Sequence, residues 1–359
     1  MHTIKAAVLR KTGGPFEIES LELEGPRENE VLVRNVASGI CHTDIMICDT
    51  RDCAAEPSVL GHEGAGVVVE VGKDVQSVQP GDHVLLSYQY CGDCEQCRNG
   101  QPWQCRHFSE LNFGFTRLDG SNTFQSNGVF GHFFGQSSFA THSVVAETNI
   151  IKISPDLNLE IICPLGCGLE TGAGTVMNLL SVPRGASIAV FGTGAVGMAA
   201  IMAARIVGAG SVIGVDIHQS RLELALELGA THVINSREND VSSSISSITG
   251  SGVDYVLEIS GNSTMAQIAV DVLNPGGTVA NIARPWDLPE LTEGRKAVGV
   301  TMGNSIPQEF IPKLINYYQK GDFPIDRLER FYDFGEINQA VADSRSGKTI
   351  KPVLRISRQ

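Results

Sequence analysis

The stretch SIAVFGTGAVG (residues 187–197) decides the fold of the second half of this 359-residue chain. Residues typical of a buried strand lead into a glycine-rich turn, and an apolar helical segment follows over residues 195–210. The turn fits the pattern G-x-G-x-x-G, in which successive glycines permit a tight turn, close approach of a pyrophosphate and packing of the helix on the strand. We therefore predict a strand–turn–helix unit that holds a dinucleotide. The turn residues expected to contact it are Gly192, Gly194, Val196 and Gly197.

Strand-like and helix-like runs alternate on the C-terminal side of this turn. SVIGVD (211–216), THVIN (231–235), VDYVLEIS (253–260) and GGTVANIA (276–283) are typical of strands, which predicts a doubly wound parallel sheet of the α/β class. Asp216 ends the first of these runs, where a carboxylate can bind the adenosine ribose hydroxyls and repel a 2′-phosphate. The sequence therefore predicts NAD rather than NADP, although Arg221 is close enough to accommodate a phosphate.

The N-terminal half has a different texture. Up to about residue 167, short β-type runs such as EVLVRNVASG (30–39) and GAGVVVEVG (64–72) alternate with turns rich in Gly and Pro. This pattern predicts a mainly β domain over residues 1–167 and a dinucleotide-binding domain over residues 168–305. Residues 306–359 are typical of a helix, loops and a final strand, and we expect them to pack back on the first domain.

The composition excludes several classes of protein. Hydrophobic residues make up 42% of the chain and charged residues 19%, which excludes a disordered protein. The 27 Lys and Arg against 40 Asp and Glu give a net charge of −13, so we expect neither nucleic-acid nor membrane binding. The apolar run Ile188–Ala204 has only 17 residues, and a membrane span needs about 20, so we interpret it as buried strand, turn and helix.

Four of the nine cysteines lie within fifteen positions. Their spacing, C-x2-C-x2-C-x7-C over residues 91–105, suits four thiolates that close a tetrahedron around zinc and leave no open position, so we predict a structural zinc site. Metal thiolates and an odd number of cysteines favour a reducing, cytoplasmic location over a disulfide framework. The four predicted ligands are Cys91, Cys94, Cys97 and Cys105.

A second candidate donor set is scattered along the chain. Cys41 in GICHTD, His62 in GHEGAG and Cys167 in PLGCGLETGAG each lie in a glycine-rich loop. Considered one by one, each fits a structural role better than a ligand role, and spacing alone does not bring them together. Taken together, they offer two thiolates and one imidazole, with a fourth zinc position left open. Three cysteines, interpreted as core thiols without an assigned role, are left over: Cys48, Cys53 and Cys163.

These motifs share one order along the chain. The residues Gly61-His62-Glu63, Gly66, Gly72 and Val75 fit G-H-E-x2-G-x5-G-x2-V, and the cysteine lobe, GCGLETGAG (166–174) and the glycine turn follow. In this order the whole chain resembles the zinc-dependent medium-chain alcohol dehydrogenases. CHTD, FFGQSSFATHSVV and GCGLETGAGTVMN particularly resemble the branch that acts on aryl or allylic alcohols. The resemblance implies a GroES-like β catalytic domain, a Rossmann domain for NAD and two zinc ions per chain. It also implies hydride transfer between NAD(H) and a primary alcohol or aldehyde.

The resemblance also implies roles for particular residues. The positions that match the catalytic zinc ligands are Cys41, His62 and Cys167. Thr43 matches the hydroxyl that hydrogen-bonds the substrate oxygen. Asp44 matches the carboxylate that orients the ligand imidazole, and Glu63 matches an acidic residue behind the metal.

Cofactor and pocket positions are implied in the same way. His42 and Lys351 match positions that contact the pyrophosphate. Thr171 matches a residue beside the nicotinamide, and Arg221 matches one near the adenosine ribose. Phe133 and Phe134 match residues that line the substrate pocket, although an aromatic β-domain core explains each of them equally well. Met46 stands where liver-type relatives carry a histidine that passes the proton to solvent, so the sequence names no terminal base. His42 is a candidate for that role only if it faces the cofactor ribose, and a phosphate contact is its alternative role.

Two other functions compete with this interpretation. One is a zinc-independent quinone or enoyl reductase of the wider superfamily, and the two sets of cysteines oppose it. The other is a non-enzymatic nucleotide-binding zinc protein, which has no need of an open metal position. We expect a small alcohol or aldehyde as the partner molecule, and a homodimer or homotetramer as the assembly.

Overall fold

The computed structural model describes residues 1–50, 55–126, 128–282 and 290–358, and Cys53 therefore lies outside the described residues. The chain divides into two compact units. The first contains Met1–Cys167, Ile306–Ile315 and Ile325–Gln359, and the second contains Gly168–Ser305 and Asn316–Pro324.

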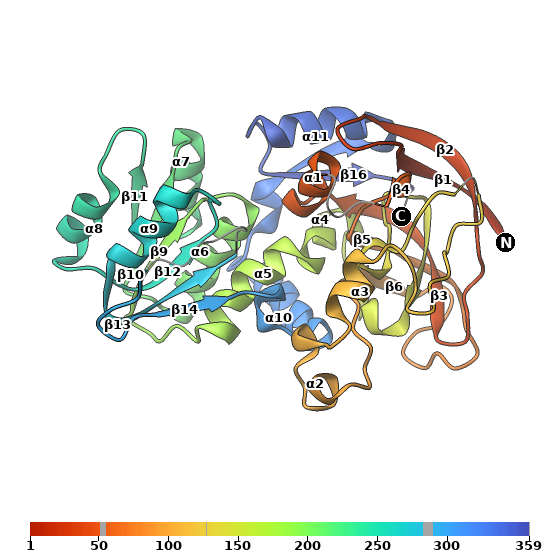
Figure 1. The fold of residues 1–359 in the computed structure, drawn as a ribbon, viewed down its shortest axis with the longest axis horizontal. Coiled ribbons are helices and arrows are strands. Elements are labelled where there is room, and N and C mark those ends of the chain that lie inside the picture. The colour runs from red at the N-terminus through yellow and green to blue at the C-terminus, as the bar shows by residue number, and fades with distance from the viewer. Residues whose placement is uncertain (51–54, 127, 283–289, 359) are drawn as a thin grey trace. The chain divides into compact units, whose positions relative to one another are not determined.

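The second unit is built on a six-stranded parallel sheet with the strand order β11-β10-β9-β12-β13-β14 (Figure 1). The chain starts at β9 in the middle, moves to β10 and β11 on one side, and returns to β12 on the other, which is the doubly wound arrangement. The strands are β9 (Ser187–Phe191), β10 (Ser211–Asp216), β11 (His232–Asn235), β12 (Val253–Glu258), β13 (Leu273–Asn281) and β14 (Lys296–Gly299). The helices are α5 (Gly168–Gly174), α6 (Ala195–Val207), α7 (Gln219–Leu228), α8 (Val241–Thr249) and α9 (Ser263–Asp271).

The interior of this sheet explains its sequence. Parallel strands covered on both faces carry near-continuous apolar runs. β9 is buried from Ile188 to Phe191, and its side chains pack with those of β10, β12 and β13 in one core. The run Ile188–Ala204 forms strand, turn and helix as predicted. Among the described residues, no helix combines the length and the apolar character that crossing a membrane requires.

The glycine turn between β9 and α6 needs its glycines for different reasons. Gly192 has a φ of 99°, a left-handed conformation that a residue with Cβ rarely adopts. A Cβ on Gly197 would lie 2.0 Å from the carbonyl oxygen of Gly192. At Gly194, by contrast, no described atom lies within 4 Å of the Cβ position. The first and third glycines are therefore required by the fold, and the second leaves open space beside the turn.

The first unit is mainly β, so the predicted fold class, a β domain joined to a doubly wound α/β domain, is confirmed. One sheet has the order β15-β16-β3-β5-β6-β8 with β7 paired to β3, and a smaller sheet has the order β2-β1-β4. The strands are β1 (His2–Leu9), β2 (Phe16–Leu23), β3 (Glu30–Gly39), β4 (Ser58–Val59), β5 (Glu63–Val71), β6 (His83–Leu86), β7 (His142–Ala146), β8 (Ile150–Ile153), β15 (Glu329–Asp333) and β16 (Lys351–Arg355). The helices are α1 (His42–Asp49), α2 (Glu95–Arg98), α3 (Phe108–Phe113), α4 (Leu159–Ile162), α11 (Ile337–Arg345) and, with residues in both units, α10 (Pro307–Gln319).

Strand β3 organises the larger sheet. It pairs with β5, β7 and β16, and because it is central it is buried along almost its whole length. The C-terminal strand β16 lies antiparallel to β3, with Val353 opposite Gly39, and parallel to β15. This pairing brings the last residues of the chain beside the start of α1. The same sheet therefore carries residues from both ends of the sequence.

The turn between β9 and α6 supplies a stability test. Replacing Gly197 by Ala should lower the free energy of unfolding by about 3 kcal/mol, because the new methyl group meets backbone that cannot move aside. Replacing Gly194 by Ala is the matched control and should change it by less than about 0.5 kcal/mol. Urea unfolding of the two variants measures the difference. Equal stabilities would show that the turn does not pack as described.

Candidate metal centre and cofactor site

One carboxylate, that of Asp44, connects helix α1 to His62. Cys41 is the residue immediately before the helix, and its N–H donates to Oδ2 of Asp44 at 2.9 Å. Asp44 therefore caps α1. Its Oδ1 accepts the N–H of Gly61 at 3.1 Å and lies 3.0 Å from Nδ1 of His62. Asp44 is 1% exposed and His62 is fully buried. The hydrogen bond to Nδ1 places the proton there and leaves Nε2 as the nitrogen that can bind a metal ion.

The three scattered donors meet in the first unit. Cys41 precedes α1, His62 precedes β5, and Cys167 follows the short helix Cys163–Gly166. Ligand atoms of these three residues and of Glu63 all lie within 4.8 Å of one another, and all four residues are buried. The Nε2 atom of His62 has no hydrogen-bond partner among the described residues. Two sulfurs and one imidazole nitrogen, the latter buried without a partner, fit a zinc ion with one open position.

The protonation states of these donors are coupled to one another and to Asp44. The pKa of the Cys41 thiol lies well below its usual value, chiefly because the Cys167 thiol donates a hydrogen bond to it. The same hydrogen bond, together with burial, raises the pKa of Cys167. Burial lowers the pKa of His62, but the Asp44 carboxylate outweighs burial and raises it well above the usual value. Cys41 is therefore the donor that loses its proton most readily, whereas a metal ion has to displace protons from Cys167 and His62 when it binds.

A buried ion pair lies behind the donors. The Lys351 ammonium is 2.9 and 2.8 Å from the two carboxylate oxygens of Glu63, and 3.3 Å from the carbonyl oxygen of Ile40. Gly39 leaves room for this pair, since a Cβ there would lie 2.0 Å from Glu63 Oε2. The resemblance matches Lys351 to a pyrophosphate contact. In the structure its ammonium is held by Glu63, and contact with the cofactor stays a prediction.

Sequence reasoning missed Glu329, which lies beside this pair. Glu329 is opposite Lys351 in the parallel register of β15 and β16. Both of its carboxylate oxygens are buried and have no hydrogen-bond partner among the described residues. Burial raises the pKa of Glu329 to about 9, so the group is neutral at pH 7. No local signal in the sequence marks this glutamate, because it meets Lys351 only through the pairing of β15 with β16.

Helix α1 places three further predicted residues. The Thr43 hydroxyl lies 3.9 Å from Cys41 Sγ, beside the donor cluster. His42 is exposed at the first helical position, and Met46 is 37% exposed one turn later. The structure therefore brings Thr43 to Cys41, whereas His42 and Met46 are exposed on the same helix.

Phenylalanine rings cover the imidazole of His62. The Phe134 ring stacks on it with a centroid distance of 4.4 Å and an interplanar angle of 26°. Phe133 meets it edge-on at 5.5 Å, and Phe113 and Phe115 extend the cluster. Phe133 is fully buried and Phe134 is 4% exposed. Their contact with a substrate stays a prediction, and their contact with the His62 ring is a finding.

The four-cysteine lobe has the geometry of a closed metal site. The Sγ atoms of Cys94 and Cys97 are 3.5 Å apart, those of Cys105 and Cys91 are 3.5 Å apart, and those of Cys91 and Cys97 are 3.9 Å apart. A tetrahedron with metal–sulfur bonds of about 2.3 Å has edges of about 3.8 Å. A disulfide bond, at about 2.0 Å, is much shorter. Backbone N–H donation from Arg106 and Cys97 lowers the pKa of Cys94 to about 6, which favours the thiolate.

Two further cysteines among the described residues lie outside both donor clusters. Cys48 and Cys163 are both buried. Burial raises the pKa of Cys48 to about 12 and raises that of Cys163 as well. Neither residue belongs to a cluster of donors that could hold a metal ion among the described residues, which agrees with their interpretation as core thiols.

In the second unit, Asp216 closes the glycine turn. Its Oδ2 accepts the N–H of Thr193 at 2.7 Å and the Thr193 hydroxyl at 2.9 Å, and its Oδ1 accepts the N–H groups of Ile217 and His218. A carboxylate has about four acceptor sites, so these bonds use most of its capacity. Thr193 was not singled out from the sequence, although it is the second residue of the turn. A ribose contact by Asp216 stays a prediction.

The remaining cofactor candidates lie in helices of the same unit. Thr171 is buried in α5, where its hydroxyl is 4.0 Å from the sulfur of Met302. Val196 lies in the first turn of α6, and Arg221 is partly buried in α7. The strands end at one edge of the sheet, at Phe191, Asp216 and Glu258. Dinucleotides bind at that edge in doubly wound folds.

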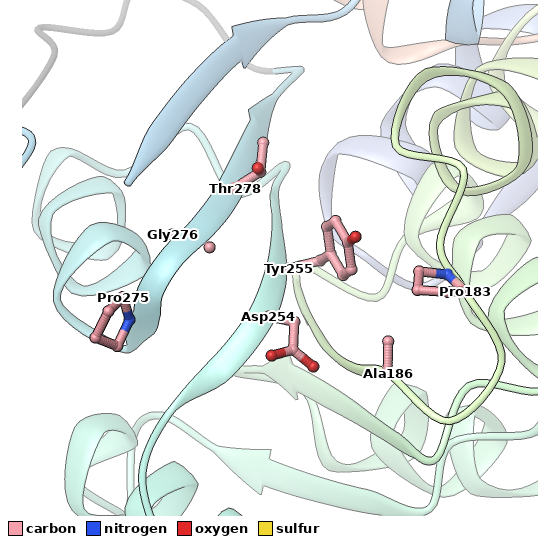
Figure 2. Close-up of a pocket in the computed structure, with 8 residues that line it drawn as sticks. Pro183, Ala186, Asp254, Tyr255, Pro275, Gly276 and Thr278 are labelled. Carbon is pink, nitrogen blue, oxygen red and sulfur yellow. The ribbon is translucent and has the colours of Figure 1, made fainter. Parts of the chain in front are cut away.

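A surface pocket of about 400 Å³ lies at the opposite edge of this sheet (Figure 2). It opens where β9 and β12 begin, and its carboxylate, Asp254, already binds Ser187 and Asn274. It is therefore separate from the predicted cofactor residues. The lining residues are Pro183, Ala186, Asp254, Tyr255, Pro275, Gly276, Gly277 and Thr278.

The buried ion pair can be tested by a double-mutant cycle. Lys351→Met leaves the Glu63 carboxylate buried without its cation and should lower the free energy of unfolding by about 3–5 kcal/mol. Adding Glu63→Gln removes the stranded charge and should restore at least half of that loss. Urea unfolding of the single and double variants measures both values. A double variant no more stable than Lys351→Met would contradict the pairing.

A buried histidine predicts how stability depends on pH. His132 is 1% exposed and neither ring nitrogen has a hydrogen-bond partner among the described residues. Burial, with the nearby Arg117, lowers its pKa to about 4. Below about pH 6.5 the unfolded chain therefore takes up a proton that the folded chain excludes, and stability falls as the pH falls towards 4.

His132→Asn removes this titration, and Asn tolerates the φ of 68° at this position. Between pH 7.5 and pH 5 the parent should lose about 2 kcal/mol more than the variant, at about 1.36 kcal/mol per pH unit below 6.5. Urea unfolding at both pH values measures this difference. Equal pH dependence in both proteins would show that the fold does not lower the pKa of His132.

Comparison with known proteins agrees with both units. The family model for the alcohol dehydrogenase GroES-like domain matches residues 27–155, and that for zinc-binding dehydrogenases matches residues 195–317. Geraniol dehydrogenase of Castellaniella defragrans is 41% identical over 362 residues, which cover 98% of this chain and 97% of that protein.

Two solved structures have the same fold over nearly the whole chain. The benzyl alcohol dehydrogenase of Acinetobacter calcoaceticus matches with a TM-score of 0.96 and 43% identity, covering 99% of this chain and 100% of that chain. An alcohol dehydrogenase zinc-binding domain protein of Burkholderia ambifaria matches with a TM-score of 0.96 and 47% identity over the same shares. With a GroES-like unit, a doubly wound unit and two cysteine-containing donor clusters, the chain belongs to the zinc-dependent medium-chain alcohol dehydrogenases.

Proposed function

We propose that this enzyme transfers a hydride between NAD(H) and a primary aryl or allylic alcohol or aldehyde, at the site formed by Cys41, His62 and Cys167. The observation that carries the proposal is the convergence of these donors, from three separate segments, within 4.8 Å of one another. The orphaned Nε2 of His62 and the hydrogen bond that the opposite ring nitrogen donates to Asp44 support it. A binding protein has no need of such an open donor set.

When bound, zinc is a Lewis acid towards the alcohol oxygen, and NAD accepts the hydride. The residues of the chain supply position and proton transfer. Asp44 holds the imidazole, and the Thr43 hydroxyl, beside Cys41, is placed to hydrogen-bond the substrate oxygen and to pass on its proton. The Glu63–Lys351 pair keeps a carboxylate and an ammonium group behind the donors without adding net charge. Met46 offers no base on α1, so the proton leaves by way of Thr43 and groups beyond it.

A second zinc ion in the four-cysteine lobe makes two ions per chain. The sulfur distances of 3.5–3.9 Å support a closed tetrahedral site at Cys91, Cys94, Cys97 and Cys105. Such a site lacks a position for substrate, so its role is to hold the lobe together. In the same proposal, the second unit binds NAD. The glycine turn holds the pyrophosphate, Asp216 and Arg221 lie at the adenosine ribose, and Thr171 lies beside the nicotinamide.

The proposed substrate class is supported by the phenylalanine rings around His62. A cluster of phenylalanine rings surrounds the imidazole, and planar aromatic or allylic groups pack well on such rings. Two similar proteins are named for such alcohols: one for geraniol, which is allylic, and one for benzyl alcohol, which is an aryl alcohol. We propose Phe133 and Phe134 as the rings that favour these substrates over ethanol, and a homodimer or homotetramer as the assembly.

A substrate panel tests the reaction. The purified protein is assayed with cinnamyl alcohol, benzyl alcohol and ethanol, each with NAD and with NADP, by the absorbance of the reduced cofactor. We expect kcat/KM for cinnamyl or benzyl alcohol to exceed that for ethanol by about 100-fold, because an apolar pocket rewards the larger apolar group. NAD should be preferred over NADP. A preference for ethanol would reject the substrate class, and no turnover on any alcohol or aldehyde would reject the activity.

A pair of cysteine variants tests the metal centre in parallel. The parent should hold two zinc ions per chain, and Cys167→Ser should hold one and lose turnover by about 1000-fold or more, a loss of several kcal/mol of transition-state stabilisation. Cys97→Ser is the matched control, which should lose the other ion and lower the melting temperature. Metal analysis and kinetics measure these outcomes. A parent with a single ion, or a Cys167→Ser variant with full turnover, would contradict the proposal.

A further inference from the structure

The loop His132–Ser138 has an unusual backbone. His132, Phe134, Gly135 and Ser137 have φ values of 68°, 52°, 65° and 50°, all in the left-handed region. Three of these four residues are not glycine, and such residues avoid this region because of steric crowding at Cβ. A backbone of this kind persists only where surrounding contacts hold it, and it is frequently found at functional sites.

The buried amide of Gln136 attaches the loop to the segment that carries His62. Its Nε2 donates to the carbonyl oxygens of His62 at 3.0 Å and of Ser87 at 2.8 Å. Its Oε1 accepts the N–H of Gly64 at 3.2 Å. The one side chain therefore binds the backbone on both sides of Glu63 and connects it to the end of β6.

Two serines extend the same attachment towards Val59. The Ser137 hydroxyl donates to the carbonyl oxygen of Val59 at 2.7 Å and accepts the N–H of Phe133 at 3.0 Å. The N–H of Ser138 donates to the carbonyl oxygen of Gly61 at 3.0 Å. The loop thus follows the strand-like segment Val59–Gly64 along its length, with His62 in the middle.

The rings of the loop restrain the imidazole itself. Phe134 stacks on the His62 ring, and Phe133 meets it edge-on. The hydrogen bond that Nδ1–H donates to Asp44 fixes this nitrogen but, as a single contact, leaves the ring able to tilt about it. A stacked ring on one face opposes that tilt. Side chain and backbone of His62 are therefore held by the same loop.

We propose that Phe134 and Gln136 are positioning residues for His62, and that the left-handed backbone of the His132–Ser138 loop exists to bring both onto it. The inference deepens the proposed function and rests on it, because it takes His62 as a ligand of the open metal site. Phe134 acts on the orientation of the imidazole, and Gln136 acts on the backbone that carries it. Residues that orient metal ligands change metal affinity by about 10–100-fold when replaced.

Cobalt(II) binding to the metal-free protein tests the proposal without reference to turnover. Its visible absorption differs between a site of four sulfurs and a site of two sulfurs and one nitrogen, so the two sites are observed separately. Cys167→Ser assigns the bands of the open site. Phe134→Leu removes the stacked ring, and Gln136→Met removes the three hydrogen bonds with little change in volume. Phe115→Leu is the matched control: its ring stacks on Phe133 at 5.3 Å, it is equally buried, its φ is 58°, and it makes no ring contact with His62.

We expect Phe134→Leu and Gln136→Met each to weaken cobalt binding at the open site by about 10–100-fold and to leave the four-cysteine site unchanged. Phe115→Leu should lower the melting temperature and leave both affinities as in the parent. The proposal would be overturned if both variants lost as much thermal stability as Phe115→Leu but kept a cobalt affinity at the open site within about threefold of the parent value. A parent that binds cobalt only in the four-cysteine lobe would instead reject the proposed metal centre, so the two failures are distinguishable.

Discussion

The carboxylate of Asp44 is the interaction on which the donor cluster depends. A charged group without solvent contact is stable only when its oxygens are well bonded, and Asp44 reaches that state by binding the N–H of Cys41, the N–H of Gly61 and the His62 ring. The bond that caps α1 therefore also sets the direction of the imidazole. Helix stability and donor geometry are coupled through a single side chain, and the position of Cys41 and that of His62 are set together.

The fold could be predicted further from sequence than the site. The glycine turn at residues 192–197 and the apolar strand before it are local signals, and the strand, turn and helix formed where they indicated. The four cysteines of residues 91–105 are also a local signal, because close spacing brings their sulfurs together. By contrast, Lys351 and Glu63 are 288 residues apart and meet only because β16 pairs with β3. No pattern within either segment announces that contact.

The residues that sequence reasoning missed have a common physical origin. Glu329, Gln136 and Thr193 look like ordinary surface residues until neighbouring segments bury them. Their importance comes from what the tertiary structure places beside them, namely a lysine, two carbonyl groups and a carboxylate. Family resemblance named the donors themselves because those positions share chemistry across relatives. It gave no role to these supporting side chains, although Gln136 and Thr193 lie within the quoted motifs and only Glu329 lies outside them.

The carboxylate at the end of β10 has a consequence for redesign of coenzyme preference. Exchanging an acidic residue at this point for a small neutral one is the direct way to admit a phosphorylated ribose. Here the same oxygens hold Thr193 and the backbone that leads into α7. Replacing Asp216 would remove the negative charge, and it would also remove the hydrogen bonds that hold the glycine turn. A change of coenzyme in this scaffold therefore requires a second substitution that re-anchors the turn, and single replacements should trade selectivity against folding.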